Sequence, residues 1–440
     1  MRIKDLNGKR VCILGFGKEG KAMFSAIEKH AKEAKMTVGD QNADALKELA
    51  NPDRVTSLKS GYTIQSGSQW LHDIGSADVI IKSPGIPPNP ELDALAAKTT
   101  SVTRIFLAEA KARGATVIGV TGSKGKSTTA SLLHAMLVAG GKNSLLLGNI
   151  GKPSIDTVGE LSDDTIVVLE MSSYQLMDLD ESPPIAVITS FFPEHLDYHG
   201  SIDAYLEAKK RIARFQERDD AVFFAARSPG AVTIAAEGSG RKIPVEPDDA
   251  PVDLAETRLL GEHNRSNIAL AWRVAEDLGV PREQAVAAIR AFTPLPHRLQ
   301  SLSAHHGIEW IDDAISTTPQ SAIAALDALG DRVRTVILGG QDRGTDFSQL
   351  ADRIKRSNVR TVLLFPGTGP RIRDALASAQ CSVAMFDAPD MPTAVCLAKE
   401  RTPIETPPAI CLLSTASPSY NMFKNFEEKG ERFREEIEKS

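Results

Sequence analysis

A segment rich in glycine and lysine, residues 119–128, is the strongest candidate for chemistry in the sequence. It reads Gly-Val-Thr-Gly-Ser-Lys-Gly-Lys-Ser-Thr and lies between an apolar run and a helix expected at 129–138. The strict phosphate-loop motif has glycine where Val120 stands, so this is a variant. Its glycines still permit a nest of backbone N–H groups, Lys126 can reach terminal phosphates, and Ser127 can bind Mg²⁺. The segment therefore predicts ATP or GTP binding; the alternative is a glycine loop with incidental lysines.

A second glycine-rich turn lies near the N-terminus. Gly15, Gly17 and Gly20 have the spacing G-x-G-x-x-G and directly follow an expected strand at 10–14. Asp40 lies 20 residues after Gly20, at the end of the next expected strand. Such glycines let the backbone approach a phosphate at a helix N-terminus, and the carboxylate could hold a ribose hydroxyl. We expect a nucleotide site here, although the same turn can serve strand-to-helix packing alone.

Glu170 and His195 follow two further apolar runs. Glu170 directly follows the run 165–169, and His195 follows the run 185–188 after a short loop. Because parallel strands end at one edge of a sheet, both side chains would lie near the glycine- and lysine-rich segment. A carboxylate and an imidazole there could hold Mg²⁺ against nucleotide phosphates. Taken alone, His195 fits a packing or capping residue equally well.

Short apolar runs alternate with helical segments along the whole chain, which predicts an α/β fold of parallel sheets with crossover helices. The runs expected to form strands are 10–14, 36–38, 78–81, 116–120, 144–147, 165–169, 185–188, 333–338, 359–365, 383–386 and 410–413. The 440 residues suggest about three domains at roughly 150 residues each. We expect these domains at 1–110, 111–296 and 297–440, with a proline-containing linker before residue 297.

The composition argues against several classes of protein. Hydrophobic residues make up 42% and charged residues 25%, as in an ordinary globular protein. The net charge of −6 argues against a broad basic surface for nucleic acid. The chain has neither an apolar stretch of the roughly 18 residues that span a bilayer nor the apolar core of a signal peptide, so we expect a cytoplasmic protein. The four cysteines fit small core residues rather than disulfides or a metal cluster.

The order and spacing of these motifs resemble the Mur ligases, in particular their glutamate-adding branch, over essentially the whole chain. The matching segments outside the motifs above are 83–85, 148–151, 171–175, 194–197, 261–267, 296–298 and 423–427, together with Lys209. The resemblance implies an N-terminal Rossmann-like nucleotide-binding domain, a central P-loop-type ATPase domain and a C-terminal Rossmann-like domain.

The resemblance also implies roles for individual positions. The UDP-substrate would contact Gly15, Phe16, Gly17, Asp40, Ser83, Gly85 and Asn149. ATP would contact Thr121, Gly122, Ser123, Lys124, Gly125, Lys126, Ser127, Thr128, Asn264, Asn267, Arg298 and Asp313. Mg²⁺ would be held by Ser127, Glu170, His195 and Lys209, the last as a carbamate, and Lys126, Glu170, His195 and Lys209 would be catalytic. Glutamate would contact Thr317, Arg343, Ser419 and Phe426. Without the resemblance, Lys209 reads as part of a solvated helix face.

The activity implied is an ATP-dependent, ADP-forming ligation of glutamate to UDP-N-acetylmuramoyl-L-alanine in peptidoglycan synthesis, by a monomer. A carboxylate is a poor acyl donor, so ATP must first convert it to an acyl phosphate, which the glutamate amine then attacks. Mg²⁺ and Lys126 would neutralise the charge on the transferred phosphoryl group. Closure of the C-terminal domain over the central one would exclude water from the acyl phosphate.

Some positions depart from the pattern of the D-glutamate-adding enzymes. Ile315 and Arg343 stand where those enzymes have lysines, and Tyr420 and Asn421 replace a leucine and an acid. The segments around Ile315 and Arg343 instead resemble the subfamily that adds L-glutamate. We therefore expect L-glutamate as the substrate, with Arg343 binding a carboxylate; the alternative is the same ligation with D-glutamate.

Three other functions explain less of the chain. A nicotinamide dehydrogenase would use the first glycine turn but leaves Glu170 and the ATP-binding segment without a role. A non-catalytic nucleotide-binding regulator would need neither Lys209 nor the segment around Arg298. Folylpolyglutamate synthase is the nearest rival, but it lacks a complete nucleotide-binding domain ahead of the ATP-binding segment, whereas more than 100 residues precede that segment here.

Overall fold

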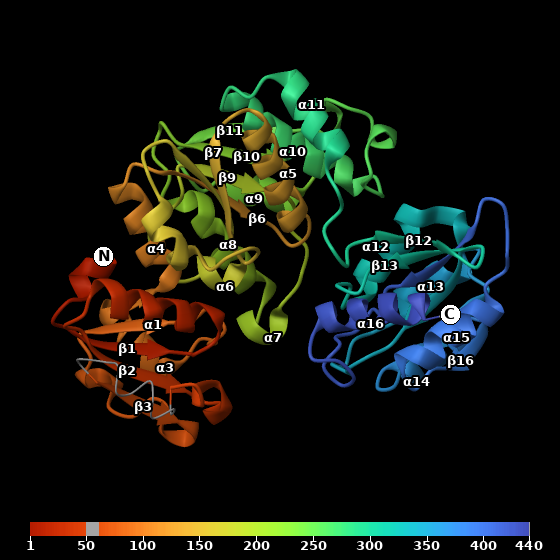
Figure 1. The fold of residues 1–440 in the computed structure, drawn as a ribbon, viewed down its shortest axis with the longest axis horizontal. Coiled ribbons are helices and arrows are strands. Elements are labelled where there is room, and N and C mark those ends of the chain that lie inside the picture. The colour runs from red at the N-terminus through yellow and green to blue at the C-terminus, as the bar shows by residue number, and fades with distance from the viewer. Residues whose placement is uncertain (50–60, 440) are drawn as a thin grey trace. The chain divides into compact units, whose positions relative to one another are not determined.

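The computed structural model describes residues 1–49 and 61–439, and these residues form three β-sheets with helices between the strands (Figure 1). All strand pairs in the first two sheets are parallel, and the third sheet has one antiparallel edge pair. The predicted α/β class with parallel sheets is confirmed.

The first sheet has the strand order β3-β2-β1-β4-β5. Its strands are β1 (Arg10–Leu14), β2 (Lys35–Asp40), β3 (Tyr62–Ser66), β4 (Val79–Lys82) and β5 (Thr99–Ser101), and its helices are α1 (Lys18–His30), α3 (Pro90–Asp93) and α4 (Val102–Ala112). Four consecutive residues are buried in β1 and all four in β4. Because successive strand residues point to opposite faces, both faces of the sheet are covered, as a parallel sheet requires.

The second sheet has the order β11-β10-β9-β6-β8-β7. Its strands are β6 (Thr116–Thr121), β7 (Asn143–Gly148), β8 (Thr165–Glu170), β9 (Ile185–Ile188), β10 (Ala221–Ala225) and β11 (Arg241–Val245). Its helices are α5 (Lys126–Ala139), α6 (Ser173–Leu176), α7 (Leu196–His199), α8 (Ile202–Arg214), α9 (Pro229–Ala235), α10 (His263–Asp277) and α11 (Arg282–Ala291). Strand β6 lies between β8 and β9, so the segments that follow these three strands leave the sheet at one edge.

The third sheet has the order β12-β13-β17-β14-β15-β16. Its strands are β12 (Gln300–His305), β13 (Ile308–Asp312), β14 (Val333–Leu338), β15 (Thr361–Leu364), β16 (Ala384–Asp387) and β17 (Ala409–Leu413). Its helices are α12 (Pro319–Leu329), α13 (Ser348–Lys355), α14 (Gly369–Ser378), α15 (Met391–Arg401) and α16 (Phe426–Glu438). Edge strand β12 pairs antiparallel with β13, and the other pairs are parallel.

Helix α16 packs against the third sheet along the apolar stripe that its sequence predicts. Phe433 and Ile437 are buried, and the ring of Phe433 meets Trp310 edge to face at 5.7 Å. Gly430 belongs to the same stripe, and a Cβ there would lie 2.0 Å from His297 Nδ1. The glycine therefore allows the helix to approach the sheet closely.

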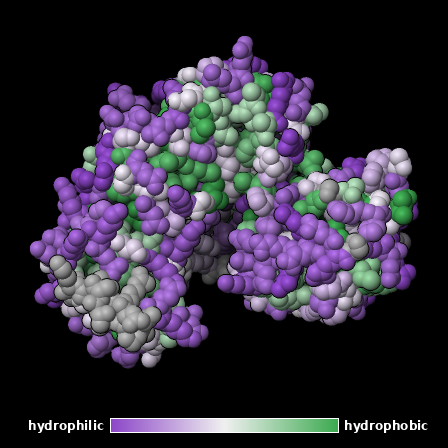
Figure 2. Space-filling model, viewed as in Figure 1, coloured by the Kyte–Doolittle hydropathy of each residue, from purple (hydrophilic) through white to green (hydrophobic). Residues whose placement is uncertain are grey.

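The chain divides into two compact units. Unit 1 contains residues 1–253 and 265–291, and unit 2 contains residues 254–264 and 292–440. The expected boundary at residue 110 lies inside unit 1, and the division into three domains stays a prediction. Among the described residues, no helix combines the length and the apolar character needed to cross a membrane. The face shown in Figure 2 is mainly hydrophilic, with separate hydrophobic patches.

Candidate active site

The loop between β6 and α5, called here the phosphate loop, is shaped by two glycines. Gly122 has φ +152°, and a Cβ on it would lie 2.0 Å from Thr189 Oγ1. Gly125 caps α5 with φ +87°, and a Cβ there would lie 2.4 Å from Asn267 Oδ1. The loop is also tied to the segment after β9, because the Lys124 N–H donates to Ser190 Oγ at 2.9 Å. No larger residue fits at either glycine, and the loop ends at a helix N-terminus, where an anion is favoured.

Two lysines converge on the phosphate loop. Lys126 Nζ donates to the carbonyl oxygens of Gly122 at 2.8 Å and Ser123 at 3.0 Å. Lys209, from α8, donates to Gly122 O at 2.9 Å and to Thr121 Oγ1 at 3.3 Å. Only 1% of Lys209 is exposed, so it lies beneath the loop rather than on a solvated helix face.

The surroundings of Lys209 disfavour its charged form. Burial lowers the pKa of Lys209 well below its usual value, and the positive charge of Lys126 lowers it further. The carboxylates of Glu194 and Glu170 act in the opposite direction, and the ring of Tyr205 lies 4.9 Å from Nζ. A lysine with a lowered pKa has a larger fraction of neutral, nucleophilic amine.

Glu170 ends β8 beside the phosphate loop and is 1% exposed. Its Oε1 accepts from Asn149 Nδ2 at 3.2 Å, whereas its buried Oε2 has no hydrogen-bond partner. A buried carboxylate oxygen without a partner is unfavourable in a folded protein, and a cation at this position would remove that cost. Glu170 therefore fits a metal ligand. Among the described residues, no group of three or more His, Cys, Asp or Glu side chains could hold a metal ion by itself. A site here would need the Ser127 hydroxyl and a modified Lys209 as well.

His195 and Ser127 flank this centre. Ser127 is buried in the first turn of α5. His195 is exposed and has φ +56°, with its ring 5.1 Å from that of Tyr174 and 6.1 Å from that of Tyr205. Because the hydroxyl of Tyr205 lies 3.0 Å from Ser123 Oγ, the histidine lies one aromatic ring away from the phosphate loop.

The residues expected to bind ATP are divided between the two units. Asn267 lies beside Gly125, and its Oδ1 accepts from Thr129 Oγ1 at 3.3 Å. The remaining three, Asn264, Arg298 and Asp313, belong to unit 2. Asp313 is buried, and its burial raises its pKa to about 6, although hydroxyls and Arg298 counteract this.

The N-terminal glycine turn is closed by the residues that the resemblance assigns to the UDP-substrate. Gly15 has φ +84°, and a Cβ on it would lie 2.8 Å from that of Ser83. The hydroxyl of Ser83 donates to Gly15 O at 2.8 Å, and Asp40 Oδ2 accepts from the Phe16 N–H at 2.7 Å. The Phe16 side chain is buried in the core, so only its backbone can face a ligand. Nothing lies within 4 Å of a Cβ built on Gly17 or Gly85.

A contact that the sequence analysis missed joins the glycine turn to the segment after Glu170. Gln175 Nε2 donates to Glu19 Oε1 at 2.7 Å, and burial raises the pKa of Glu19. The hydroxyl of Tyr198 contacts the carbonyl oxygens of Pro84 and Ile86, each at 2.7 Å. Local sequence carries no signal for these contacts, because each joins segments more than 100 residues apart.

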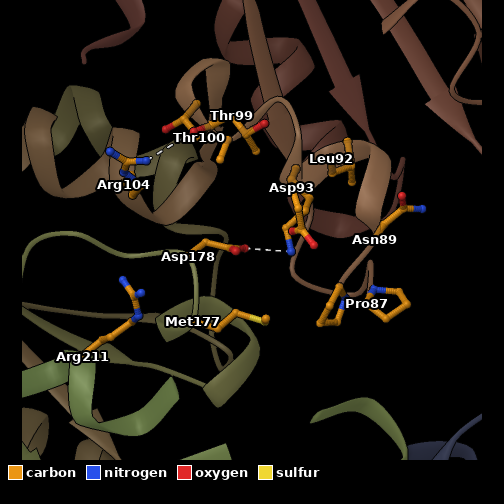
Figure 3. A pocket seen from close by; sticks show the side chains of 13 residues that line it. Pro87, Asn89, Leu92, Asp93, Thr99, Thr100, Arg104, Met177, Asp178 and Arg211 are labelled. Carbon is orange, nitrogen blue, oxygen red and sulfur yellow. Dashed lines mark hydrogen bonds and ion pairs between the residues drawn. The ribbon is translucent and has the colours of Figure 1, made fainter. Parts of the chain in front are cut away.

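Unit 1 also contains a pocket at the end of β4, shown in Figure 3. Lys82 forms an ion pair with Asp178 at 2.9 Å, and Arg104 pairs with Asp180. Arg211 donates to the carbonyl of Leu179. The cations that line the pocket thus have partners within the protein. We therefore interpret the pocket as a junction between two parts of unit 1 rather than as a substrate site.

Unit 2 brings the residues expected to bind glutamate to one edge of its sheet. Thr317, Arg343 and Ser419 lie on the loops that follow β13, β14 and β17, which are neighbouring parallel strands. Phe426 begins α16, and its ring lies 6.0 Å from that of His297. Arg343 is exposed, whereas Ser419 is 5% exposed and its buried Oγ has no hydrogen-bond partner.

Family models match two parts of the chain. Residues 120–246 match the Mur ligase middle domain, and residues 297–403 match the Mur ligase, glutamate ligase domain. The chain is 33% identical to the UDP-N-acetylmuramoyl-L-alanine--L-glutamate ligase of Salinispora tropica, over 99% of both chains. It is 32% identical to the UDP-N-acetylmuramoylalanine--D-glutamate ligase of Symbiobacterium thermophilum, over 98% of both chains.

Solved structures share the fold at lower sequence identity. MurF from Acinetobacter baumannii has a TM-score of 0.63 at 15% identity, with 99% of this chain and 98% of that chain covered. A folylpolyglutamate synthase of Mycobacterium tuberculosis complexed with ADP has a TM-score of 0.60 at 15% identity, with 80% of this chain and 95% of that chain covered.

Proposed function

The chain belongs to the Mur ligase family, and we propose that it is an ATP-dependent, ADP-forming ligase that joins glutamate to UDP-N-acetylmuramoyl-L-alanine in peptidoglycan synthesis. The observation that carries this proposal is the convergence of Lys126, Lys209 and the unpartnered Glu170 oxygen at the phosphate loop. A dehydrogenase would need none of these groups. The relative from Salinispora tropica, whose name states this reaction, aligns over 99% of both chains.

The first step transfers the terminal phosphoryl group of ATP to the carboxylate of the UDP-substrate. The backbone N–H groups of the phosphate loop and the N-terminus of α5 favour the negative charge of the phosphates. Lys126 now caps carbonyl oxygens of its own loop, and its amine would turn to the transferred phosphoryl group. Its positive charge would stabilise the charge that spreads over the phosphoryl oxygens in the transition state.

Glu170, Ser127, His195 and a carbamylated Lys209 would hold Mg²⁺ in this site. The ion would supply positive charge that neutralises the phosphate oxygens. The neutral amine of Lys209 would bond to the carbon of CO₂ and lose one proton, which converts an amine into an anionic oxygen donor. The lowered pKa of Lys209 supports this modification, because only the neutral amine reacts.

The second step joins glutamate to the acyl phosphate. Its amine attacks the acyl carbon, a tetrahedral intermediate forms, and phosphate leaves as the amide bond is made. Thr317, Arg343, Ser419 and Phe426 would bind the amino acid on unit 2, and the unpartnered hydroxyl of Ser419 suits a carboxylate. Because two carboxylates must be paired with donors, Arg343 would bind one of them through its planar guanidinium.

We assign UDP-substrate binding to a domain at 1–110, ATP binding to 111–296 and glutamate binding to 297–440. The enzyme would act in the cytoplasm, where ATP and the UDP-linked substrate are present. L-glutamate is the proposed acceptor because Ile315 and Arg343 replace the two lysines of the D-glutamate-adding pattern. D-glutamate is the second candidate, favoured by the relative from Symbiobacterium thermophilum, whose name includes it.

The test is a ligation assay with the purified full chain, UDP-N-acetylmuramoyl-L-alanine, ATP and each glutamate enantiomer. We expect ADP and the UDP-linked dipeptide in equal amounts, with L-glutamate the faster acceptor. The absence of ADP formation with all three substrates present would contradict a ligase and favour a non-catalytic nucleotide-binding regulator. Turnover with folate in place of the UDP-substrate would favour folylpolyglutamate synthase.

A further inference from the structure

Helix α16 carries a buried lysine that the proposed mechanism does not use. Lys429 is 1% exposed, and its Nζ donates to Thr415 Oγ1 at 2.6 Å. We propose that Lys429 is a positioning residue, which fixes the three loops of the proposed glutamate site through Thr415. This inference rests on the proposed function, because it concerns the amino-acid site of that reaction.

Thr415 is the point at which the three loops are tied together. Its Oγ1 also lies 3.2 Å from Ser316 O, on the loop after β13, and 3.0 Å from Ser417 O, on its own loop after β17. Its carbonyl oxygen accepts from the Gly339 N–H at 2.8 Å, on the loop after β14. One residue therefore contacts every loop that carries a residue expected to bind glutamate.

Lys429 determines how the Thr415 hydroxyl can be used. Because the amine donates to Thr415, it occupies a lone pair of Oγ1, and the hydroxyl hydrogen is directed toward a carbonyl oxygen. Burial lowers the pKa of Lys429, and the carboxylates of Asp312 and Asp313, at the end of β13, partly counteract this. The lysine thus connects α16 to the loop after β17 and, through Thr415, to Ser316 on the loop after β13.

Two features indicate that the position of these loops matters for binding rather than only for folding. Ser419, four residues after Thr415, keeps a buried Oγ without a hydrogen-bond partner, which is costly unless a ligand uses it. Phe426, three residues before Lys429, begins the helix that carries the lysine. A shift of α16 would therefore move two expected glutamate contacts together.

The experiment compares Lys429→Met, Lys429→Arg and Thr415→Val with the wild type in the full ligation assay. Displacement of binding groups by a fraction of an ångström should raise KM for glutamate roughly tenfold or more in Lys429→Met and Thr415→Val. KM for the UDP-substrate should stay within about twofold, because its proposed contacts at the N-terminal glycine turn lie in unit 1. Lys429→Arg keeps the charge and should recover most of the affinity.

A double variant and a matched control complete the test. Lys429→Met combined with Thr415→Val should be no worse than the more affected single variant, because both changes break one connection. Lys439→Met removes an exposed lysine just after the same helix and should behave as the wild type. If Lys429→Met fails to fold, Thr415→Val carries the test alone.

Two results would overturn the inference. One is an unchanged KM for glutamate in a folded Lys429→Met or Thr415→Val variant. The other is an equal rise in the KM of all three substrates, which would indicate a general structural role. Failure of the proposed function is distinguishable from both, because the wild type itself would then form no UDP-linked dipeptide.

Discussion

Lys209 in unit 1 and Lys429 in unit 2 are each 1% exposed, and burial lowers the pKa of both amines. Their charged surroundings differ, because a second cation lies beside Lys209. Lys126 lowers the pKa of Lys209 further while Glu194 and Glu170 raise it, whereas the charged groups that act on Lys429, Asp312 and Asp313, both raise its pKa, which is about 7. Burial of a lysine amine is thus combined with different neighbouring charges in the two units.

The difference indicates two uses for a buried lysine. A second cation beside Lys209 opposes the ammonium form, so this amine is suited to react or to be modified. The charged groups that act on Lys429 are both carboxylates and its amine donates to Thr415 Oγ1, so this amine is suited to hold neighbouring groups in place. We expect changes in unit 1 to affect chemistry and changes at Lys429 to affect stability and amino-acid binding.

The largest expected effect follows from removing the neighbour of Lys209. Lys126→Ala should lower kcat about a thousandfold, because one charge that stabilises the phosphoryl transition state is lost. The fold should remain intact, because the Lys126 amine donates to the carbonyl oxygens of Gly122 and Ser123 in its own loop. Steady-state kinetics and the thermal unfolding temperature of the full chain check both expectations. Turnover close to that of the wild type would refute the assigned role.

Lys209→Ala tests whether the buried amine acts as a carbamate. We expect about a hundredfold loss of activity, the scale found when a group that supports a metal site is removed. Formate or high bicarbonate should restore part of the activity, because a small carboxylate can occupy the vacated space and supply the missing oxygen. A fully active alanine variant would show that Lys209 has no catalytic role.

A variant of the second buried lysine, Lys429→Ala, is the control for this rescue. Lys429→Ala should not respond to formate, because the lost group is a cation rather than an anionic oxygen. In the wild type, ¹³C-bicarbonate should give a carbamate signal that Lys209→Ala lacks and Lys429→Ala keeps. A signal lost in both variants would contradict the distinction between the two lysines.

Lys429 should also make stability depend on pH. In the unfolded chain a lysine keeps its proton up to a pKa of 10.5, whereas in the folded chain the pKa of Lys429 is about 7. Unfolding between these pH values takes up a proton, so this group makes the wild type more stable as the pH rises, by up to about 1.4 kcal/mol per pH unit. The buried carboxylate of Asp313, with a pKa of about 6, is mainly ionised in this range.

Unfolding by denaturant at pH 7, 8.5 and 10 checks this dependence, with Lys429→Met as the reference. The wild type should gain stability relative to the variant as the pH rises, because methionine cannot titrate. A difference that stays constant or shrinks with pH would show that the pKa of Lys429 is not lowered in the folded chain. The exposed Lys439→Met variant should follow the wild type at every pH.

Much of the fold could be predicted because buried parallel strands are continuous apolar runs. Strands β6 and β14, for example, lie at the apolar runs that predicted them. Edge strands β3 and β11 were not among the expected strands, because they have few buried residues and lack this signal. The antiparallel strand β12 is another edge strand, and its polar sequence gives no apolar run.

The phosphate loop could be predicted for a different reason, since its glycines are required by the backbone itself. Gly122 and Gly125 have positive φ values and no room for a side chain. Lys209 could not be placed by local reasoning, because it lies in a charged segment of α8 and only its position beneath the loop buries it. The contact of Glu19 with Gln175 was missed because it depends on tertiary structure.

The smallest expected effect concerns Arg343 and the preference for one enantiomer of glutamate. A glutamate has two carboxylates, and a closed site must pair both with donors. Ile315 supplies no charge, so we expect Arg343 to take over the role of the lysines of the D-glutamate-adding pattern. Its neighbour Asp342 pairs with Arg371 of α14 at 2.5 Å, so this carboxylate already has a cationic partner. Arg343→Lys should reduce the preference for L-glutamate by about tenfold, because the ammonium group of lysine cannot make the two parallel hydrogen bonds that a planar guanidinium makes to a carboxylate.

The measurement is kcat/KM for both enantiomers in the wild type, in Arg343→Lys and in the control Arg356→Lys, which changes an exposed arginine just after α13. Enantiomers differ in where the side chain leaves the α-carbon when the amine and the α-carboxylate are held fixed. A relocated anchor for the side-chain carboxylate therefore changes which hand fits. A wild type that strongly prefers D-glutamate would show that Arg343 only substitutes for a lysine and that the anchor has not moved.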